Sequence, residues 1–110
     1  MLNRDWPPLP TIAEVARAFR LGEFTPSEYV ERCAARIEEW EPRLHAWVTL
    51  DLEAARHAAA QATDELRRGE DRGPLHGIPL GIKDLIDVKG LPTRAGSPLR
   101  RDHRATGDAP

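Results

Sequence analysis

The chain has 110 residues and a formal net charge of −2 at pH 7, from 16 lysines and arginines and 18 aspartates and glutamates. Both signs are mixed along the sequence, so no basic surface predicts nucleic-acid binding. No apolar run approaches the ~20 residues that span a bilayer, residues 1–10 lack a signal peptide's apolar core, and the single cysteine excludes an internal disulfide, so we expect a cytoplasmic protein.

Two short patterns near the beginning predict helices. Residues 1–10 are rich in proline and are expected to form an extended lead-in. Thr11 and Glu14 have the spacing of a capping box, which predicts a short helix that Gly22 ends. The segment TPSE at residues 25–28 repeats the device, with proline at the first helical position, so a second helix is expected to begin there.

The second helix is predicted to stop at Pro42, because a proline disfavours helical backbone at the residue before it. Its apolar stripe is expected to face the core and consists of Tyr29, Cys33, Ile37 and Trp40. Cys33 lies on this stripe, so we interpret it as a packing residue and not as a nucleophile.

The middle of the chain predicts a strand, a helix and a second strand. Residues 44–50 contain Val48 and Thr49 and alternate as a strand does. Asp51 is expected to cap a helix over residues 51–68, and residues 78–83 alternate again. The helix presents a narrow stripe of Ala55, Ala59, Ala62 and Leu66. This order is typical of a βαβ unit, so the expected fold class is α/β, with two to three helices and an unpaired sheet edge through which two copies could associate.

Lys83 ends the second predicted strand, and the residues that share its face are small. Only two of the 16 lysines and arginines are lysines, and the other one, Lys89, lies in a predicted turn. Arginine keeps its proton in proteins, whereas a desolvated lysine can become a neutral base, so Lys83 is a candidate general base. The residues leave one alternative open, a structural ion pair with Asp84 or Asp87.

Other candidate site residues have simpler interpretations. His76 could be grouped with Asp84 and Asp87, but the spacing matches no closed ligand set, so neither a metal nor another cofactor is expected. Ser97 belongs to a predicted turn, where a local backbone hydrogen bond is expected. The basic run at residues 100–104 is short and interrupted by an aspartate, which favours a solvated loop over a phosphate or RNA contact.

The segment HGIPLGIKD at residues 76–84 is followed by IDV at 86–88, GLPT at 90–93 and AGS at 95–97. This pattern resembles the start of the amidase signature family, which includes bacterial amidases and the A subunit of glutamyl-tRNA amidotransferase. The resemblance implies a Ser-Ser-Lys hydrolase of amides, in which a lysine deprotonates a bridging serine that in turn activates a nucleophilic serine. Of these three catalytic residues, only the lysine has a counterpart in this sequence, at Lys83.

The resemblance also implies that residues 11–110 are the N-terminal part of an amidase domain, truncated before the serine-rich segment and inactive alone. Residues 108–110 have the pattern of a helix start. Leu85 stands where the tRNA-linked subunits often have asparagine, which favours a general amidase acting on small-molecule amides. Two other hypotheses stay open: a stand-alone interaction module that pairs through its strand edge, and an A subunit working in tRNA-dependent amidation.

Overall fold

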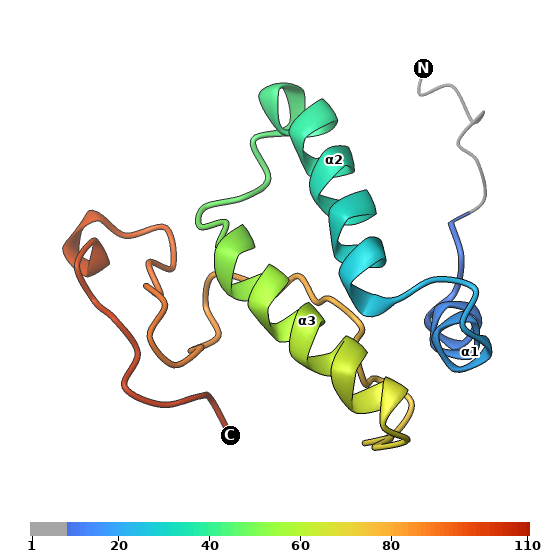
Figure 1. Cartoon of the computed structure of the whole chain (residues 1–110). Coiled ribbons are helices and arrows are strands. Elements are labelled where there is room, and N and C mark those ends of the chain that lie inside the picture. The colour runs from blue at the N-terminus through green and yellow to red at the C-terminus, as the bar shows by residue number, and fades with distance from the viewer. Residues whose placement is uncertain (1–8) are drawn as a thin grey trace. The chain divides into compact units, whose positions relative to one another are not determined.

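The computed structural model describes residues 9–110, so most of the expected lead-in at residues 1–10 lies outside the described residues. Three α-helices and one short 3-10 helix follow in order along the chain (Figure 1): α1 (Ile12–Leu21), α2 (Pro26–Leu44), α3 (Leu52–Arg67) and η1 (Pro98–Arg100). The chain forms two compact units. The first combines the residues up to Ile37 with Leu52–Pro79, and the second combines Glu38–Asp51 with Leu80–Pro110.

Both predicted capping boxes are present in the first unit. The Thr11 Oγ1 atom accepts a hydrogen bond from the Glu14 N–H at 3.2 Å, and the Glu14 carboxylate accepts one from the Thr11 N–H at 2.7 Å. Thr25 and Glu28 make the same pair of bonds, again at 3.2 and 2.7 Å. Gly22 ends α1 with a left-handed φ of 69°, as predicted.

Alanines and one aromatic cluster form the core of the first unit. The predicted stripe of α3 is confirmed, because Ala59 and Ala62 are buried and Ala55 and Leu66 are half-buried. Their small side chains allow close packing. The ring of Phe19 is buried and contacts two other aromatic rings edge-on, those of Phe24 and Tyr29.

The predicted stripe of α2 is wrong by one row of residues. The buried side chains of this helix are Pro26, Val30 and Ala34, whereas the expected stripe of Tyr29, Cys33, Ile37 and Trp40 is only half-buried. Two apolar rows lie next to each other on α2, and the row of smaller side chains faces inward. Tyrosine and tryptophan side chains are rarely covered completely, which fits the partial exposure of the expected row.

Pro42 does not stop α2, which continues to Leu44. A proline lacks one N–H and therefore removes a single bond of the helix ladder. The last turn is closed instead by the His45 N–H, which donates to the Glu41 carbonyl oxygen at 2.9 Å. The helix ends because His45 adopts a left-handed φ of 48°.

Neither predicted strand forms within residues 9–110, and no βαβ unit is present there; the only β-bridge found in this range is an isolated one between Pro92 and Arg104. Leu44 is helical, and the N–H groups of Ala46 and Trp47 donate to the Glu41 carboxylate at 3.2 and 3.0 Å. These donors are therefore not available for a sheet ladder. The α/β class and the exposed sheet edge are corrected accordingly: the described residues form three α-helices and one short 3-10 helix, connected by loops.

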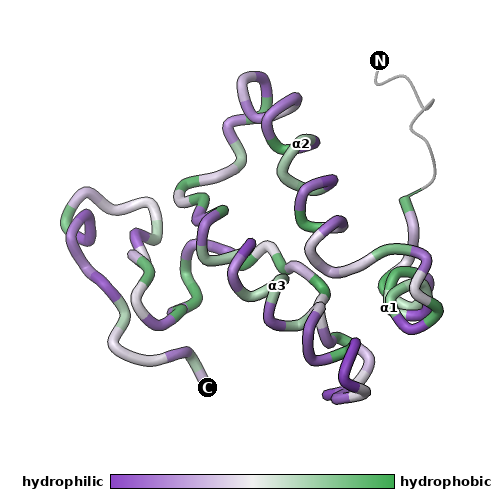
Figure 2. The backbone as a smooth tube through the Cα atoms, in the orientation of Figure 1, coloured by the Kyte–Doolittle hydropathy of each residue, from purple (hydrophilic) through white to green (hydrophobic). Residues whose placement is uncertain are grey.

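Hydrophobic residues recur along the loops as well as along the helices (Figure 2). Several of those in the second unit are exposed, among them Leu80 at 64% and Ile82 at 48%. Extended segments need neighbouring strands to cover such side chains and to pair their backbone. Within residues 9–110, no helix has the length and apolar content needed to cross a bilayer.

Loop-to-loop backbone bonds hold the second unit together. The Gly90 N–H donates to the Ala105 carbonyl oxygen at 2.8 Å, and the Ala105 N–H donates to the Leu91 carbonyl oxygen at 3.0 Å. The helix start expected at residues 108–110 stays a prediction. The Asp108 carboxylate accepts a hydrogen bond from the Lys89 N–H at 2.8 Å.

Candidate active site

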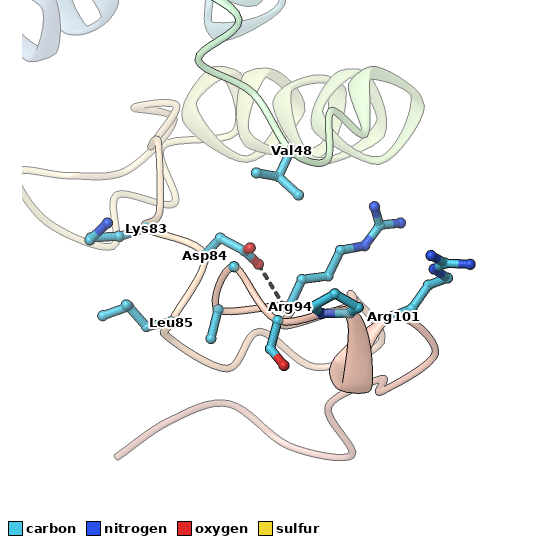
Figure 3. A pocket seen from close by; sticks show the side chains of 10 residues that line it. Val48, Lys83, Asp84, Leu85, Arg94 and Arg101 are labelled. Atoms are coloured by element: carbon cyan, nitrogen blue, oxygen red, sulfur yellow. Dashed lines mark hydrogen bonds between the residues drawn. The ribbon is translucent and has the colours of Figure 1, made fainter.

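The second unit contains a pocket of about 560 Å³, drawn in Figure 3. It combines apolar side chains with three cations and one carboxylate. The lining residues are Val48, Lys83, Asp84, Leu85, Arg94, Ala95, Gly96, Ser97, Pro98 and Arg101. Most of them come from the segment that carries the family resemblance and from the loop that follows it.

Asp84 fixes the shape of this pocket. One of its carboxylate oxygens accepts a hydrogen bond from the Arg94 N–H at 2.9 Å, and its carbonyl oxygen accepts one from the Ala95 N–H at 2.9 Å. Ala95 has a left-handed φ of 49°, which is uncommon for a residue with a side chain. These two hydrogen bonds to Asp84 therefore hold the tight turn at Arg94 and Ala95 next to Lys83 in the chain.

Lys83 lines the pocket and is exposed. Its carbonyl oxygen accepts hydrogen bonds from the N–H groups of Leu85 and Ile86, at 2.8 and 3.0 Å, so the chain turns immediately after it. In the part of the chain that the structure describes, its amine forms no ion pair with Asp84 or Asp87. The structural alternative for this lysine is thus not observed, and neither is the dry environment that a neutral amine needs.

His76 lies in the first unit and is engaged there by Glu65. The His76 Nε2 atom is 2.8 Å from a Glu65 carboxylate oxygen, and its Nδ1 atom accepts a hydrogen bond from the Arg72 N–H at 3.2 Å. The second bond requires Nδ1 to be unprotonated, so in the neutral ring the Nε2–H group donates a hydrogen bond to Glu65. Glu65 also accepts hydrogen bonds from the side chains of Gln61 and Arg72.

Glu65 is a buried carboxylate that sequence reasoning missed. Only 5% of the residue is exposed. Its pKa is lowered first by the hydrogen bond from Gln61 and further by His76 and the Arg72 guanidinium. Its position one turn after the buried Ala62 was the available signal, because a carboxylate on the inward face of a helix needs partners. Within residues 9–110, no cluster of three or more metal-ligating side chains is found.

The two serines have structural partners, and the cysteine is half-buried. Ser97 caps η1 and accepts a hydrogen bond from the Leu99 N–H at 3.3 Å, which confirms the predicted local bond. The Ser27 hydroxyl lies 3.1 Å from the hydroxyl of Thr63. Burial raises the pKa of the Cys33 thiol, which fits a packing role.

Comparison with known proteins identifies the family to which this chain belongs. The family model for amidases matches residues 28–110, three quarters of the chain, so the chain belongs to the amidase family. This match includes all the lining residues of the pocket.

The individual relatives that match this chain have different names. The chain is 46% identical to the A subunit of glutamyl-tRNA(Gln) amidotransferase from Chloroflexus aggregans, over 79% of this chain and 18% of the relative. It is 41% identical to an amidase of Pseudomonas putida, over 80% of this chain and 19% of the relative. It is 44% identical to 2-amino-5-chloromuconic acid deaminase of Comamonas testosteroni, over 79% and 19%. The chain thus spans about a fifth of the length of these relatives.

Solved structures agree with this assignment. A crystal structure of an amidase matches with a TM-score of 0.75 and 47% identity, covering 79% of this chain and 20% of the other. An inhibitor-bound protein of a vestigial complex, linked to the origin of an s-triazine catabolic enzyme, matches with a TM-score of 0.85 and 29% identity. That second match covers 91% of this chain and 22% of the other.

Proposed function

We propose that this chain is part of an amide hydrolase in which Lys83 is the general base of a Ser-Ser-Lys triad. The observation that carries the proposal is the position of Lys83: it lies within the matched amidase segment and lines a pocket. The amine would accept a proton from a bridging serine, and that serine would accept one from the nucleophilic serine as its oxygen attacks the amide carbonyl.

The two serines of the triad are not supplied by this chain. Ser27 contacts Thr63 and Ser97 caps η1, so the proposal assigns neither of them as the nucleophile. The 110-residue chain alone is therefore proposed to be inactive, and turnover to require the intact hydrolase. We also propose that the substrates are small-molecule amides and that the intact protein works in the cytoplasm, where the free Cys33 would remain reduced.

The test is an amide hydrolysis assay on the intact enzyme with Lys83→Ala and Lys83→Arg. We expect both variants to lose on the order of 10²–10⁴ in kcat, the contribution typical of a general base. The matched control is Lys89→Ala, because Lys89 is the second lysine of the chain and is an exposed turn residue outside the pocket. Activity that survives both changes at position 83 would remove the assigned role.

A second function is favoured by one specific observation, the 46% identity to the A component of an amidotransferase. Such a component would act with partner proteins in tRNA-dependent amidation. Copurification of the intact protein with stoichiometric partner subunits would support this function, and a lone active enzyme would exclude it. The hypothesis of a stand-alone interaction module is no longer favoured. It relied on pairing through a strand edge, and no strand is found within residues 9–110.

A further inference from the structure

The loop from Arg94 to Arg104 carries four arginines, which differ in what they contact. The Arg100 Nε atom donates to the Thr93 carbonyl oxygen and an Arg104 guanidinium nitrogen donates to the Gly90 carbonyl oxygen, each at 3.0 Å. The guanidinium groups of Arg94 and Arg101 form no ion pair or hydrogen bond with any residue in the range 9–110. These two are also the arginines that line the pocket.

The backbone, and not the side chain, of each of these two arginines holds the loop. The Arg94 N–H donates to the Asp84 carboxylate and its carbonyl oxygen accepts from the Ser97 N–H at 2.9 Å. The Arg101 N–H donates to the Pro98 carbonyl oxygen at 3.3 Å. Both guanidinium groups are therefore dispensable for the loop's observed bonds and available to a ligand.

The pocket suits a ligand that is partly apolar and carries a negative charge. Val48, Leu85 and Pro98 contribute apolar surface, and cations outnumber the single carboxylate among the lining side chains. Figure 3 shows Lys83 on one side of Asp84 and the side chains of Arg94 and Arg101 on the other. A ligand's anionic end is thus attracted to the arginine side, away from the Asp84 charge.

We propose that Arg94 and Arg101 form a carboxylate-binding site, so that the preferred substrates are amides that also carry an ionised carboxylate. A planar guanidinium matches a carboxylate with two parallel hydrogen bonds, which distinguishes this ligand from a neutral amide of the same shape. The inference rests on the proposed function, since it places the substrate amide on the Lys83 side of the same pocket.

The test compares succinamate with succinamide, because the two molecules have the same shape and differ in one negative charge. The kcat/KM ratio of succinamate to succinamide is measured for the intact enzyme and for Arg94→Gln and Arg101→Gln. We expect each substitution to lower this ratio about tenfold through a higher KM for succinamate, and high salt to lower it in the wild type. Arg17→Gln, an exposed arginine of α1 outside the pocket, is the matched control.

A binding experiment on the 110-residue chain gives a second readout that needs no turnover. Succinate should produce saturable NMR shifts at the backbone amides of Ala95 and Gly96, and these shifts should be lost in both arginine variants. An unchanged kinetic ratio in those variants, or succinate shifts that persist in them, would overturn the inference. Tighter binding of inorganic phosphate than of succinate would also overturn it, in favour of a phosphate ligand.

Failure of this inference is distinguishable from failure of the proposed function. Hydrolysis of the neutral succinamide requires Lys83 in the proposal but neither arginine. If the arginine variants keep the wild-type ratio while the Lys83 variants are inactive, the carboxylate site is wrong and the general base stands. If the Lys83 variants stay active, the general base is wrong, and the succinate shifts then decide the carboxylate site alone.

Discussion

Gly77→Ala should destabilise the fold through a steric conflict at one buried proline. Gly77 has a φ of +82°, and a Cβ atom added there would lie 2.6 Å from the Pro26 Cγ atom and 3.3 Å from the Phe19 Cε2 atom. Pro26 is fully buried and begins α2, so it cannot turn aside. The conflict would fall in the loop that leads into the Lys83 segment.

The magnitude follows from two separable terms. A left-handed backbone costs a residue with a side chain about 1 kcal/mol or somewhat more. Overpacking a filled site adds about 1–3 kcal/mol. Gly69 provides the matched control, because its φ is +79° and nothing lies within 4 Å of the position of its Cβ atom. We expect Gly69→Ala to lose about 1 kcal/mol and Gly77→Ala about 3 kcal/mol.

Urea unfolding followed by far-ultraviolet circular dichroism measures both variants. The helices supply the signal, and the slope of the transition should stay constant if only the native state changes. A loss of about 3 kcal/mol would be a large share of the 5–15 kcal/mol typical of a folded domain. Equal losses for the two alanine variants would refute the packing argument and leave only the backbone term.

Two further predictions concern buried polar groups. Because the pKa of Glu65 is lowered in the folded chain, its ionised form adds stability that is complete above the unfolded value of about 4.3 and is lost as the pH falls through the folded pKa. In urea unfolding, the free energy of unfolding of Glu65→Gln should therefore fall less than that of the wild type as the pH is lowered below about 4.3. The same fall in both proteins would contradict this. The Thr93 Oγ1 atom is buried and finds no hydrogen-bond partner within residues 9–110. Thr93→Val should raise the free energy of unfolding by about 1 kcal/mol in the same assay, whereas a loss would reveal a role for the hydroxyl.

Sequence reasoning succeeded where structure is local. Each capping box joins residues three apart, Thr11 with Glu14 and Thr25 with Glu28, so the pattern contains both partners. Gly22, which ends α1, acts through its own left-handed backbone angle. Such features need no knowledge of the rest of the fold.

Sequence reasoning failed where a residue had a choice of distant partners. The Glu41 carboxylate takes the N–H groups of Ala46 and Trp47, which the strand prediction had assigned to a sheet. The Glu65 carboxylate pairs with the His76 ring, 11 positions away, and the pattern of the sequence did not indicate this pair. Periodicity describes which side chains share a face, but it does not say which acceptor a backbone donor will find.

The segment before Lys83 was predicted to be a strand but is exposed, and this exposure bears on the proposed chemistry. Leu80 and Ile82 leave apolar surface in water, and alternating residues of this kind are suited to a strand whose neighbours cover them. A lysine must also leave water before it can act as a neutral base. One event, pairing of residues 78–83 with further strands of an intact amidase, would satisfy both requirements. We therefore expect hydrogen exchange at these amides to be fast in the 110-residue chain and slow in the intact enzyme, and equal rates in the two would separate the strand pattern from the catalytic role.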